Sequence, residues 1–596
     1  MCGIVGLYQK KGIDKKILTE MTNTLAHRGP DDQGVYIHKN IGLGQRRLSI
    51  LDLSSLGHQP MISHNGRYII SFNGEIYNYL DIRQDLIKLG YKFKSNSDTE
   101  VILAAFEEWG VKSLEHFNGM FAFVIFDKKK REIFAARDRL GIKPLYYWFD
   151  GEKLILASEI KAILKYPGFK VEVDPNALNE YFTFQNIYSD KTLFQGVKLL
   201  PPAHYLTYDG SSLQSFRYWD VPMEKKELSP EEWEQKVLAT FKKAVKRHLI
   251  SDVEIGCYLS GGMDSASLAS LASEDNPSIK TFTGGFDLSS ATGLEAAFDE
   301  RQDAEKVAKL YSSEHYEMVM HSGSMARILP KLIWHLEDLR VGMCYPNYYI
   351  SALASKFVKV VLSGAAGDEL FGGYPWRYNL VQDLSDPVAF DQSYYDYWSR
   401  LVKDKEKTEF FSEKFAEKID FTEPFKQYRQ IIEPFDHLSP VEKALYFELK
   451  TFLPGLFVVE DKVSMAHSIE ARVPFADQEL VELALSIPYE LKTNGTSGKM
   501  VLRKAMSHLL PETIINRKKQ GFSPPEGSWY QDESLPYVKE ILLNKKALSR
   551  GYFKPEYIEK VIDDHASGKA NNRLLIWSLL SFEWWCRIFL DGEKIN

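Results

Sequence analysis

A glycine-rich segment between an apolar run and a helical pattern places the strongest constraint on the fold of this sequence. The apolar residues 255–259 lead into Ser-Gly-Gly-Met-Asp-Ser at 260–265, and a helical pattern runs from Ala266 to Glu274. Backbone N–H groups at such a junction point outward at the positive end of a helix dipole, where they can cradle phosphate oxygens. A side chain at either glycine would obstruct that approach. The segment therefore predicts a phosphate-binding turn between a strand and a helix.

The sequence around this turn indicates a parallel sheet. Apolar runs at 280–283 and 357–362 alternate with helical patterns such as the one from Asp299 to Tyr311, an order typical of a parallel sheet covered by helices. From about Val388 onward helical patterns dominate, and the apolar stretch 574–590 is expected to be a buried C-terminal helix. The turn lacks the Gly-Lys-Ser/Thr ending of a Walker loop, and 498–500 does not supply one, which disfavours a kinase acting at the γ-phosphate.

The first two hundred residues follow a different pattern, with short strands separated by turns. Residues 121–126, 127–131 and 132–136 indicate a strand, a polar turn and a strand. Near Leu200, two prolines, the Asp-Gly-Ser-Ser turn at 209–212 and the lysine- and glutamate-rich stretch 224–234 indicate a connector. A chain of 596 residues is too long for a single hydrophobic core. We expect one domain at 1–215 and a second at 216–596.

Composition excludes several classes of partner. The formal net charge of -7 provides no basic field for nucleic acid or anionic lipid. Four scattered cysteines form neither a zinc-site spacing nor a disulfide framework, which fits a reducing cytoplasm. No signal peptide is expected at the start of the chain, and the stretch 574–590 is interrupted by charges and does not predict a membrane span. The oligomeric state is left open, with a homodimer as one possibility.

A cysteine next to the initiator methionine is a candidate nucleophile. Removal of Met1, which is normal before a small residue, would put the Cys2 thiol beside an α-amine. The α-amine has a pKa of about 7.7 to 8.0 and can act as the general base for the thiol without a histidine. An isolated Met-Cys-Gly would be an accidental start, so the interpretation depends on the motifs that follow.

Four further motifs follow in order. They are His-Arg-Gly-Pro-Asp at 27–31, Arg-Leu-Ser-Ile at 47–50, Asn-Gly-Glu-Ile-Tyr-Asn at 73–78 and Ser-Asp-Thr-Glu at 97–100. Together with residues 1–6 they resemble the class II glutamine amidotransferases, a branch of the N-terminal nucleophile hydrolases. The resemblance implies that Cys2 attacks the glutamine amide, and that the Asn73 side chain and the Gly74 backbone N–H hold the oxyanion.

Recognition of free glutamine needs a cation and an anion, because the ligand carries a carboxylate and an ammonium. The Arg47 fork can grip the carboxylate, and Asp98 and Glu75 can accept hydrogen bonds from the ammonium. Each of these charges taken alone would be interpreted as a solvated surface residue. The resemblance implies a glutamine-binding set that consists of Arg47, Ile50, Asn73, Gly74, Glu75 and Asp98.

The second half of the chain resembles another group of enzymes. Ser-Gly-Gly-x-Asp-Ser is similar to the signature of ATP pyrophosphatases, which split ATP between the α and β phosphates and activate a carboxylate as its adenylate. Residues 464–475 and 517–522 resemble segments of the asparagine synthetases, so the resemblance covers nearly the whole chain. The ATP-binding residues that it implies are Leu259, Ser260, Gly261, Gly262, Asp264, Ser265, Gly284, Ser363 and Gly364.

The resemblance also implies a metal site, a catalytic lysine and a fold. Asp264 and Asp368 would hold Mg²⁺, whose hard character suits carboxylate oxygens. Lys499 would stabilise charge on the adenylate and pyrophosphate, although a solvated loop lysine is the competing interpretation. The expected fold is an αββα N-terminal-nucleophile glutaminase sandwich followed by a parallel-sheet ATP-pyrophosphatase domain with a helical tail.

One position departs from the family pattern. The usual Ser-Gly-Glu-Gly-x-Asp-Glu loop reads Ser-Gly-Ala-Ala-Gly-Asp-Glu at 363–369, so that Ala365 stands where a glutamate implicated in aspartyl adenylate formation is expected. Glu337, Asp338 or Glu369 could fill the missing role. Arg340 could instead bind a second anionic group, which would favour a larger acid than aspartate.

Several functions therefore remain in competition. The first is glutamine-dependent asparagine synthesis, and the second is amidation of another carboxylate, such as a uronic acid in surface polysaccharide synthesis. Phosphoribosyl amidotransferases and sugar-phosphate aminotransferases share the glutaminase half but have no place for the segment 260–265. A regulatory glutamine-binding protein would need neither the nucleophile Cys2 nor the metal ligands Asp264 and Asp368.

Overall fold

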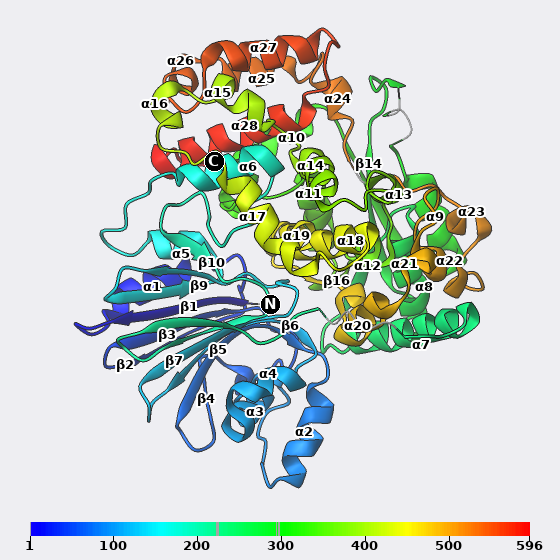
Figure 1. Ribbon diagram of the computed structural model, residues 1–596. Coiled ribbons are helices and arrows are strands. Elements are labelled where there is room, and N and C mark those ends of the chain that lie inside the picture. Colours follow the sequence, from blue (N-terminus) through cyan, green and yellow to red (C-terminus); the bar gives the residue numbers. More distant parts are fainter. Residues whose placement is uncertain (1, 222–225, 294, 296–297, 522, 596) are drawn as a thin grey trace.

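The computed structural model describes residues 2–221, 226–293, 295, 298–521 and 523–595. Met1, residues 224 and 225 of the expected connector, and Phe522 of the family-like segment lie outside the described residues. We refer to residues 2–217 as the N-terminal half and to 230–595 as the C-terminal half. Figure 1 shows the β-rich N-terminal half below the largely helical C-terminal half, with the N-terminus at the boundary between them.

Two antiparallel sheets form the centre of the N-terminal half. The first has the order β10-β8-β9-β1-β3-β2, with bounds Val197–Leu199, Tyr146–Phe149, Lys153–Ala157, Cys2–Gln9, Ile41–Arg47 and Asp32–His38. The second has the order β12-β11-β7-β6-β5-β4, with bounds Leu213–Arg217, His204–Tyr208, Glu132–Arg137, Gly119–Asp127, Tyr68–Ile76 and Met61–Ile62. The strand, turn and strand expected at 121–136 are confirmed as β6 and β7.

Side-chain alternation along β6 explains why the sheets stack. Successive residues of a strand point to opposite faces: Ala122 and Val124 enter the core between the two sheets, whereas Phe121 and Phe123 enter the core under α2 and α3. On the other sheet, helices α1 and α5 cover the outer face of β1. Four layers result, and the expected αββα sandwich is confirmed. The helices of this half are α1 Lys15–Asn23, α2 Tyr79–Lys88, α3 Asp98–Trp109, α4 Ser113–His116, α5 Ile160–Leu164 and α6 Pro175–Phe184.

The C-terminal half is built on a five-stranded parallel sheet. Its order is β15-β14-β13-β16-β17, with bounds Glu314–Met320, Lys280–Phe286, Ile255–Tyr258, Val360–Leu362 and Glu470–Arg472. Cores lie on both faces, since Leu362 of β16 packs with α8 on one face and Val361 packs with α11 on the other. The chain leaves β13 toward β14 on one side and returns to β16 on the other. Such a reversal opens a crevice at the carboxyl ends of the strands.

Helices cover the sheet and form the tail, as expected. They are α7 Pro230–His248, α8 Met263–Asp275, α9 Arg301–Leu310, α10 Gly323–Leu336, α11 Tyr345–Ala354, α12 Gly367–Phe371, α13 Pro375–Asn379, α14 Pro387–Trp398, α15 Lys407–Phe410, α16 Glu413–Ala416, α17 Glu423–Ile432, α18 Pro440–Lys450, α19 Phe452–Met465, α20 Gln478–Ser486, α21 Tyr489–Lys492, α22 Met500–Ala505, α23 Glu512–Ile515, α24 Glu526–Trp529, α25 Leu535–Leu542, α26 Lys545–Leu548, α27 Pro555–Ala566 and α28 Arg573–Trp585. The buried C-terminal helix is confirmed as α28 and the π-helical turn Cys586–Leu590. No helix in the described part of the chain has the length and apolar character needed to cross a membrane.

The junction between the halves differs in detail from the expectation. Strand β12 extends across the expected boundary between 215 and 216, and we propose that the boundary lies after Arg217. The charged stretch expected to be a connector becomes helical at Pro230, because Ser229 and Glu232 form a capping box with the proline at the first helical position. Helix α6 of the N-terminal half packs among the tail helices through Phe182, which contacts Phe410, Phe553 and Phe582.

Candidate active sites

The candidate nucleophile begins the first strand of the N-terminal half. Cys2 lies opposite Arg47 in the β1–β3 register and is 6% exposed. Its backbone nitrogen donates to Asn73 Oδ1 at 2.9 Å, whereas Asn73 Nδ2 is buried without a hydrogen-bond partner in the described part of the chain. Burial raises the pKa of the Cys2 thiol above its usual value, against the opposing effects of the Leu48 N–H and Arg47. The thiol therefore needs a base, and an unused amide donor lies on the residue that binds its backbone.

Gly74 follows Asn73 and makes a close backbone approach possible. Its φ is +153°, and a Cβ built there would lie 2.1 Å from the Met120 carbonyl oxygen on the neighbouring strand. A side chain would therefore force β5 away from β6 beside Asn73.

The expected glutamine-binding charges gather around these residues. Arg47 is anchored by the turn that follows it, since its Nη2 donates to the carbonyl oxygens of Leu51 at 3.0 Å and Asp52 at 2.6 Å. Asp98 opens α3 and accepts from the Ile76 N–H at 3.0 Å, and burial raises the pKa of its carboxyl to about 6. Ile50 is buried in a core shared with the C-terminal half.

Glu75 has a partner that the sequence did not indicate. Arg472, on β17 of the C-terminal half, approaches its carboxylate at 3.5 Å. Burial, with the negative charge of Glu470 nearby, raises the pKa of Glu75 well above its usual value. This candidate glutamine-binding residue therefore also belongs to the contact between the halves.

A cavity of about 240 Å³ lies in the C-terminal half, at the carboxyl ends of β13, β14 and β16. The predicted ATP-binding residues that line it are Leu259, Ser260, Gly262, Asp264, Ser265, Gly284, Ser363 and Gly364. Gly261 is not among the lining residues, and a Cβ there would lie 1.9 Å from Arg517 Nη1. Glycine at this position therefore allows Arg517 to cover the turn. The predicted strand, turn and helix at 255–274 are confirmed.

Two carboxylates face each other across this cavity. Asp264 lies in the first turn of α8 and Asp368 in the first turn of α12, and a Cβ on Gly367 would come within 2.7 Å of the Asp264 carboxyl. Lys499 Nζ contacts both, at 2.6 Å from Asp368, and Lys519 Nζ lies 2.6 Å from the other Asp368 oxygen. Burial raises the pKa of the Asp264 carboxyl, while for Asp368 the two lysines outweigh burial and hold its pKa below the usual value.

These groups fit a divalent cation that arrives with a phosphate ligand. Asp264 Oδ1 is buried and has no hydrogen-bond partner in the described part of the chain. A hard cation could take this oxygen, with Asp368 and phosphate oxygens as further ligands. Lys499 is 4% exposed and bridges the two carboxylates, so the interpretation as a solvated loop lysine is wrong.

The three acids considered as replacements for the missing family glutamate do not line the cavity. Glu337 is buried at the contact between the halves, where it pairs with Lys161 at 3.1 Å and with Lys462. Asp338 accepts from the Tyr146 hydroxyl at 3.0 Å and pairs with Arg340. Glu369 accepts from the Tyr374 hydroxyl at 2.7 Å, and burial raises its pKa to about 7. None of the three is among the residues lining the cavity.

Arg340, considered as a binder of a second anionic group on the acceptor, is not among the residues lining the cavity. Its guanidinium donates to the Ile187 carbonyl and is paired with Asp338 at 2.9 Å, with 6% of the residue exposed. Asp338 thus neutralises the charge of Arg340 at a place outside the 240 Å³ cavity.

Sequence reasoning missed Glu460, Asn347, Glu300 and Lys519 as cavity residues. Lys519 stands in the family-like segment 517–522 and could have been singled out there. Glu460 belongs to no motif, and only its place on α19 brings it to the cavity.

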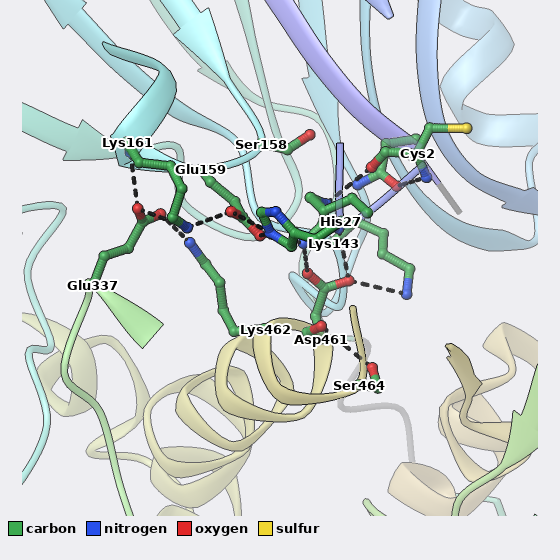
Figure 2. Close-up of polar contacts among 12 residues, drawn as sticks. Cys2, His27, Lys143, Ser158, Glu159, Lys161, Glu337, Asp461, Lys462 and Ser464 are labelled. Carbon is green, nitrogen blue, oxygen red and sulfur yellow. Dashed lines mark hydrogen bonds and ion pairs between the residues drawn. The ribbon is translucent and has the colours of Figure 1, made fainter. Parts of the chain in front are cut away.

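A buried polar network connects the Cys2 strand to helix α19, which also carries the cavity residue Glu460 (Figure 2). Arg28 Nε donates to the Cys2 carbonyl at 3.0 Å, and its Nη1 lies 2.8 Å from Asp461 Oδ2 on α19 and 3.0 Å from Glu159. Lys143 Nζ approaches the other Asp461 oxygen at 3.4 Å. Although burial alone would lower the pKa of Arg28, Asp461 and Glu159 raise it above the usual value.

Comparison with known proteins agrees with the two-part architecture. The glutamine amidotransferase domain model matches residues 1–219, and the asparagine synthase model matches residues 236–587. Fold and sites together define a glutamine-hydrolysing ligase. The chain belongs to the asparagine synthase family.

Individual relatives cover nearly the whole chain. Asparagine synthetase [glutamine-hydrolyzing] 1 of Bacillus subtilis is 31% identical over 99% of this chain and 97% of its own length. Asparagine synthetase [glutamine-hydrolyzing] 3 of the same organism is 32% identical over 95% and 94%. Amidase chry2 of Gibberella zeae is 29% identical over 93% of each chain. The relatives that match over nearly the whole chain therefore include a protein named as an amidase beside proteins named as asparagine synthetases.

Proposed function

We propose that the chain is a glutamine-dependent asparagine synthetase, which converts glutamine, aspartate and ATP into glutamate, asparagine, AMP and pyrophosphate. The observation that carries the proposal is the buried link from Cys2 through Arg28 to α19, which ties a candidate glutaminase site to a cavity suited to a nucleotide. Family membership supports the same pairing of activities.

The first half-reaction would use the residues around Cys2. The thiol attacks the side-chain amide of glutamine, with the α-amine released by loss of Met1 as its base. Asn73 Nδ2, buried and unpartnered among the described residues, and the Gly74 N–H would hold the oxyanion. Arg47 would bind the carboxylate of glutamine, and Asp98 and Glu75 its ammonium. Water then releases glutamate, and the ammonia passes to the C-terminal half.

The second half-reaction would take place in the cavity of the C-terminal half. The turn 260–265 is suited to the ATP phosphates, and Asp264 with Asp368 would hold Mg²⁺. When bound, that ion neutralises charge on the phosphates and favours departure of pyrophosphate. Lys499, already in contact with both carboxylates, would move to the phosphate oxygens and stabilise the adenylate. The aspartate side chain attacks the α-phosphate, and ammonia then displaces AMP.

The identity of the acceptor is the part of the proposal that most needs a test. The alternative is an enzyme of the same family that amidates another carboxylate such as a uronic acid, and Ala365 is the observation that favours it. Arg340, the cation considered for a second acidic group, pairs with Asp338 and does not line the cavity, which favours aspartate.

The test is pyrophosphate release by the purified enzyme with ATP, Mg²⁺ and ammonia. Aspartate is compared with glutamate, glucuronate and galacturonate, and the nucleotide product is identified by chromatography. We expect AMP, with aspartate at least tenfold faster than the others. Inactivity with aspartate beside rapid release with another acid would refute asparagine synthesis, and ADP as product would refute the pyrophosphatase assignment.

A further inference from the structure

The cavity contains a carboxylate on α19 that is not one of the candidate metal ligands. Glu460, on α19, lines the cavity together with Ser363, whose hydroxyl favours the charged form of the Glu460 carboxyl and so acts to lower its pKa. Ser363 Oγ also accepts from the Ala365 N–H at 3.4 Å. Glu460 thus lies beside the loop position at which the family glutamate is replaced by alanine, and it approaches that position from a different element.

The Glu460 carboxylate differs from the other carboxylates of the cavity in its ion pairing. Asp264 and Asp368 are in contact with Lys499, and Glu300 pairs with Arg517 at 3.2 Å. Within the described ranges, Glu460 makes no ion pair with a lysine, arginine or histidine. Burial raises the pKa of its carboxyl, which makes the carboxylate a stronger base than an exposed glutamate. Because the Ser363 hydroxyl is neutral, the Glu460 carboxylate remains able to accept a proton.

The position of Glu460 also relates it to the source of ammonia. Asp461, the next residue, pairs with Arg28 and Lys143 of the N-terminal half, and Arg28 binds the Cys2 carbonyl. Figure 2 shows Asp461 and Lys462 on one helix, with Lys143 paired to Asp461 and with Lys161 and Lys462 both paired to Glu337. Glu460, which lines the cavity, is therefore adjacent in α19 to the residue that contacts the glutaminase half.

We propose that Glu460 is the catalytic base of amide formation, accepting the proton that ammonia loses as it adds to the acyl adenylate. This inference rests on the proposed function. The nitrogen lone pair forms the new C–N bond, one N–H proton moves to the Glu460 carboxylate, and the C–O bond to AMP breaks with its electron pair leaving on the phosphate. The products are the carboxamide, AMP and protonated Glu460, which returns its proton to solvent.

The experiment separates activation of the acid from its amidation. Glu460→Gln keeps the size of the side chain but cannot accept a proton, and Glu559→Gln, on the exposed side of α27, makes the same change far from the cavity. Three rates are measured at pH 8: acceptor-dependent exchange of labelled pyrophosphate into ATP, amide formation with ammonia, and hydroxamate formation with hydroxylamine. Hydroxylamine is a stronger nucleophile that loses its proton more easily than ammonia, and so depends less on a base.

We expect Glu460→Gln to keep pyrophosphate exchange within about threefold of the wild type and to lose about 100-fold in amide formation, the range of general base catalysis. Hydroxylamine should restore turnover to within tenfold. Amide formation within threefold of the wild type would overturn the proposal, as would equal losses in all three rates, because these indicate a role in binding or folding. Glu559→Gln should match the wild type throughout.

Failure of the proposed function gives a different result. If the wild type is inactive with aspartate but active with another carboxylate, the asparagine assignment falls and the three rates are compared with that acid, so that Glu460 is still tested. A wild type inactive with every acid, while a correctly folded preparation hydrolyses glutamine, overturns both proposals.

Discussion

Arg28 of the N-terminal half donates to both carboxylate oxygens of Asp461 on α19, at 2.8 Å and 3.3 Å, and neither side chain is exposed. Removing one charge from such a pair leaves the other buried and unpaired, which costs several kcal/mol. The contact also has a functional side, because Arg28 Nε binds the Cys2 carbonyl.

We therefore expect Asp461→Asn to destabilise the protein by about 3 kcal/mol and to raise the ratio of glutamate formed to AMP formed above one. Arg28 would keep Glu159 as a partner, Lys143 would lose the carboxylate with which it pairs, and the Cys2 strand would lose its anchor on α19. Thermal unfolding and paired product assays measure the two effects. Asp85→Asn breaks an exposed pair with Lys88 on α2 and should change stability by less than about 0.5 kcal/mol. An unchanged product ratio in Asp461→Asn would argue against coupling through this pair.

Replacement of the candidate nucleophile should separate the two half-reactions. Cys2→Ala is expected to abolish glutamine hydrolysis, by at least 1000-fold, and to keep ammonia-dependent synthesis within about twofold, because only the first site uses the thiol. Glutamate release and pyrophosphate release are the two measurements. Cys344→Ala is the matched control, since burial raises the pKa of that thiol to about 12 and leaves it unreactive. Loss of ammonia-dependent synthesis in folded Cys2→Ala would contradict the division of labour.

Removal of either carboxylate at the nucleotide cavity should have the opposite effect. Asp264→Asn and Asp368→Asn are each expected to slow acceptor-dependent pyrophosphate release at least 100-fold and to spare basal glutamine hydrolysis, because a weaker cation clamp fails where charge develops on the leaving group. Raising Mg²⁺ should recover part of the activity if the loss is one of metal affinity. Asp532→Asn, at an exposed site, is the control. Equal loss of glutamine hydrolysis would point to misfolding instead.

A buried glutamate in the tail should make stability depend on pH. Burial raises the pKa of Glu526 to about 8, beside the hydroxyls of Tyr345 and Tyr530. Between the unfolded value near 4.5 and pH 8 the unfolded chain has lost this proton and the folded chain keeps it, so stability falls as pH rises through this window. Glu526→Gln should remove that slope: its melting temperature should equal or fall below that of the wild type at pH 5 and exceed it at pH 8. Parallel melting curves for the two proteins would show that Glu526 does not titrate in this way.

Individual strands and helices could be predicted from the sequence because they depend on local patterns, whereas the αββα order of layers came from the family resemblance. Alternating side chains on β6 and the strand–turn–helix at 255–274 are each contained in one short segment. The residues Asp264, Asp368 and Lys499 stand in three separate segments, and only the resemblance to the asparagine synthetases assigned them to one site. The capping box at Ser229 was present in the sequence but was interpreted as a charged connector.

The remaining features depend on contacts between distant segments. Glu337 accepts hydrogen bonds from the backbone of Ile160 and Lys161, more than a hundred residues away, and no local pattern distinguishes it from a cavity residue. Glu460 and Asp461 are adjacent acids with different surroundings, and only the packing of α19 determines which of them meets the cavity. Sequence could propose that an acid replaces the missing glutamate, but not which one.

The contact between the halves also limits which domains of relatives can be combined with this protein in a chimera. The C-terminal half holds two buried carboxylates that cations of the N-terminal half neutralise. Arg28 and Lys143 pair with Asp461, and Lys161 pairs with Glu337, which also has Lys462 of its own half as a partner. A chimera that joined this synthetase portion to a glutaminase lacking those cations would carry an uncompensated carboxylate at its seam. Exchange of parts between relatives must therefore transplant the counter-charges together with the domain.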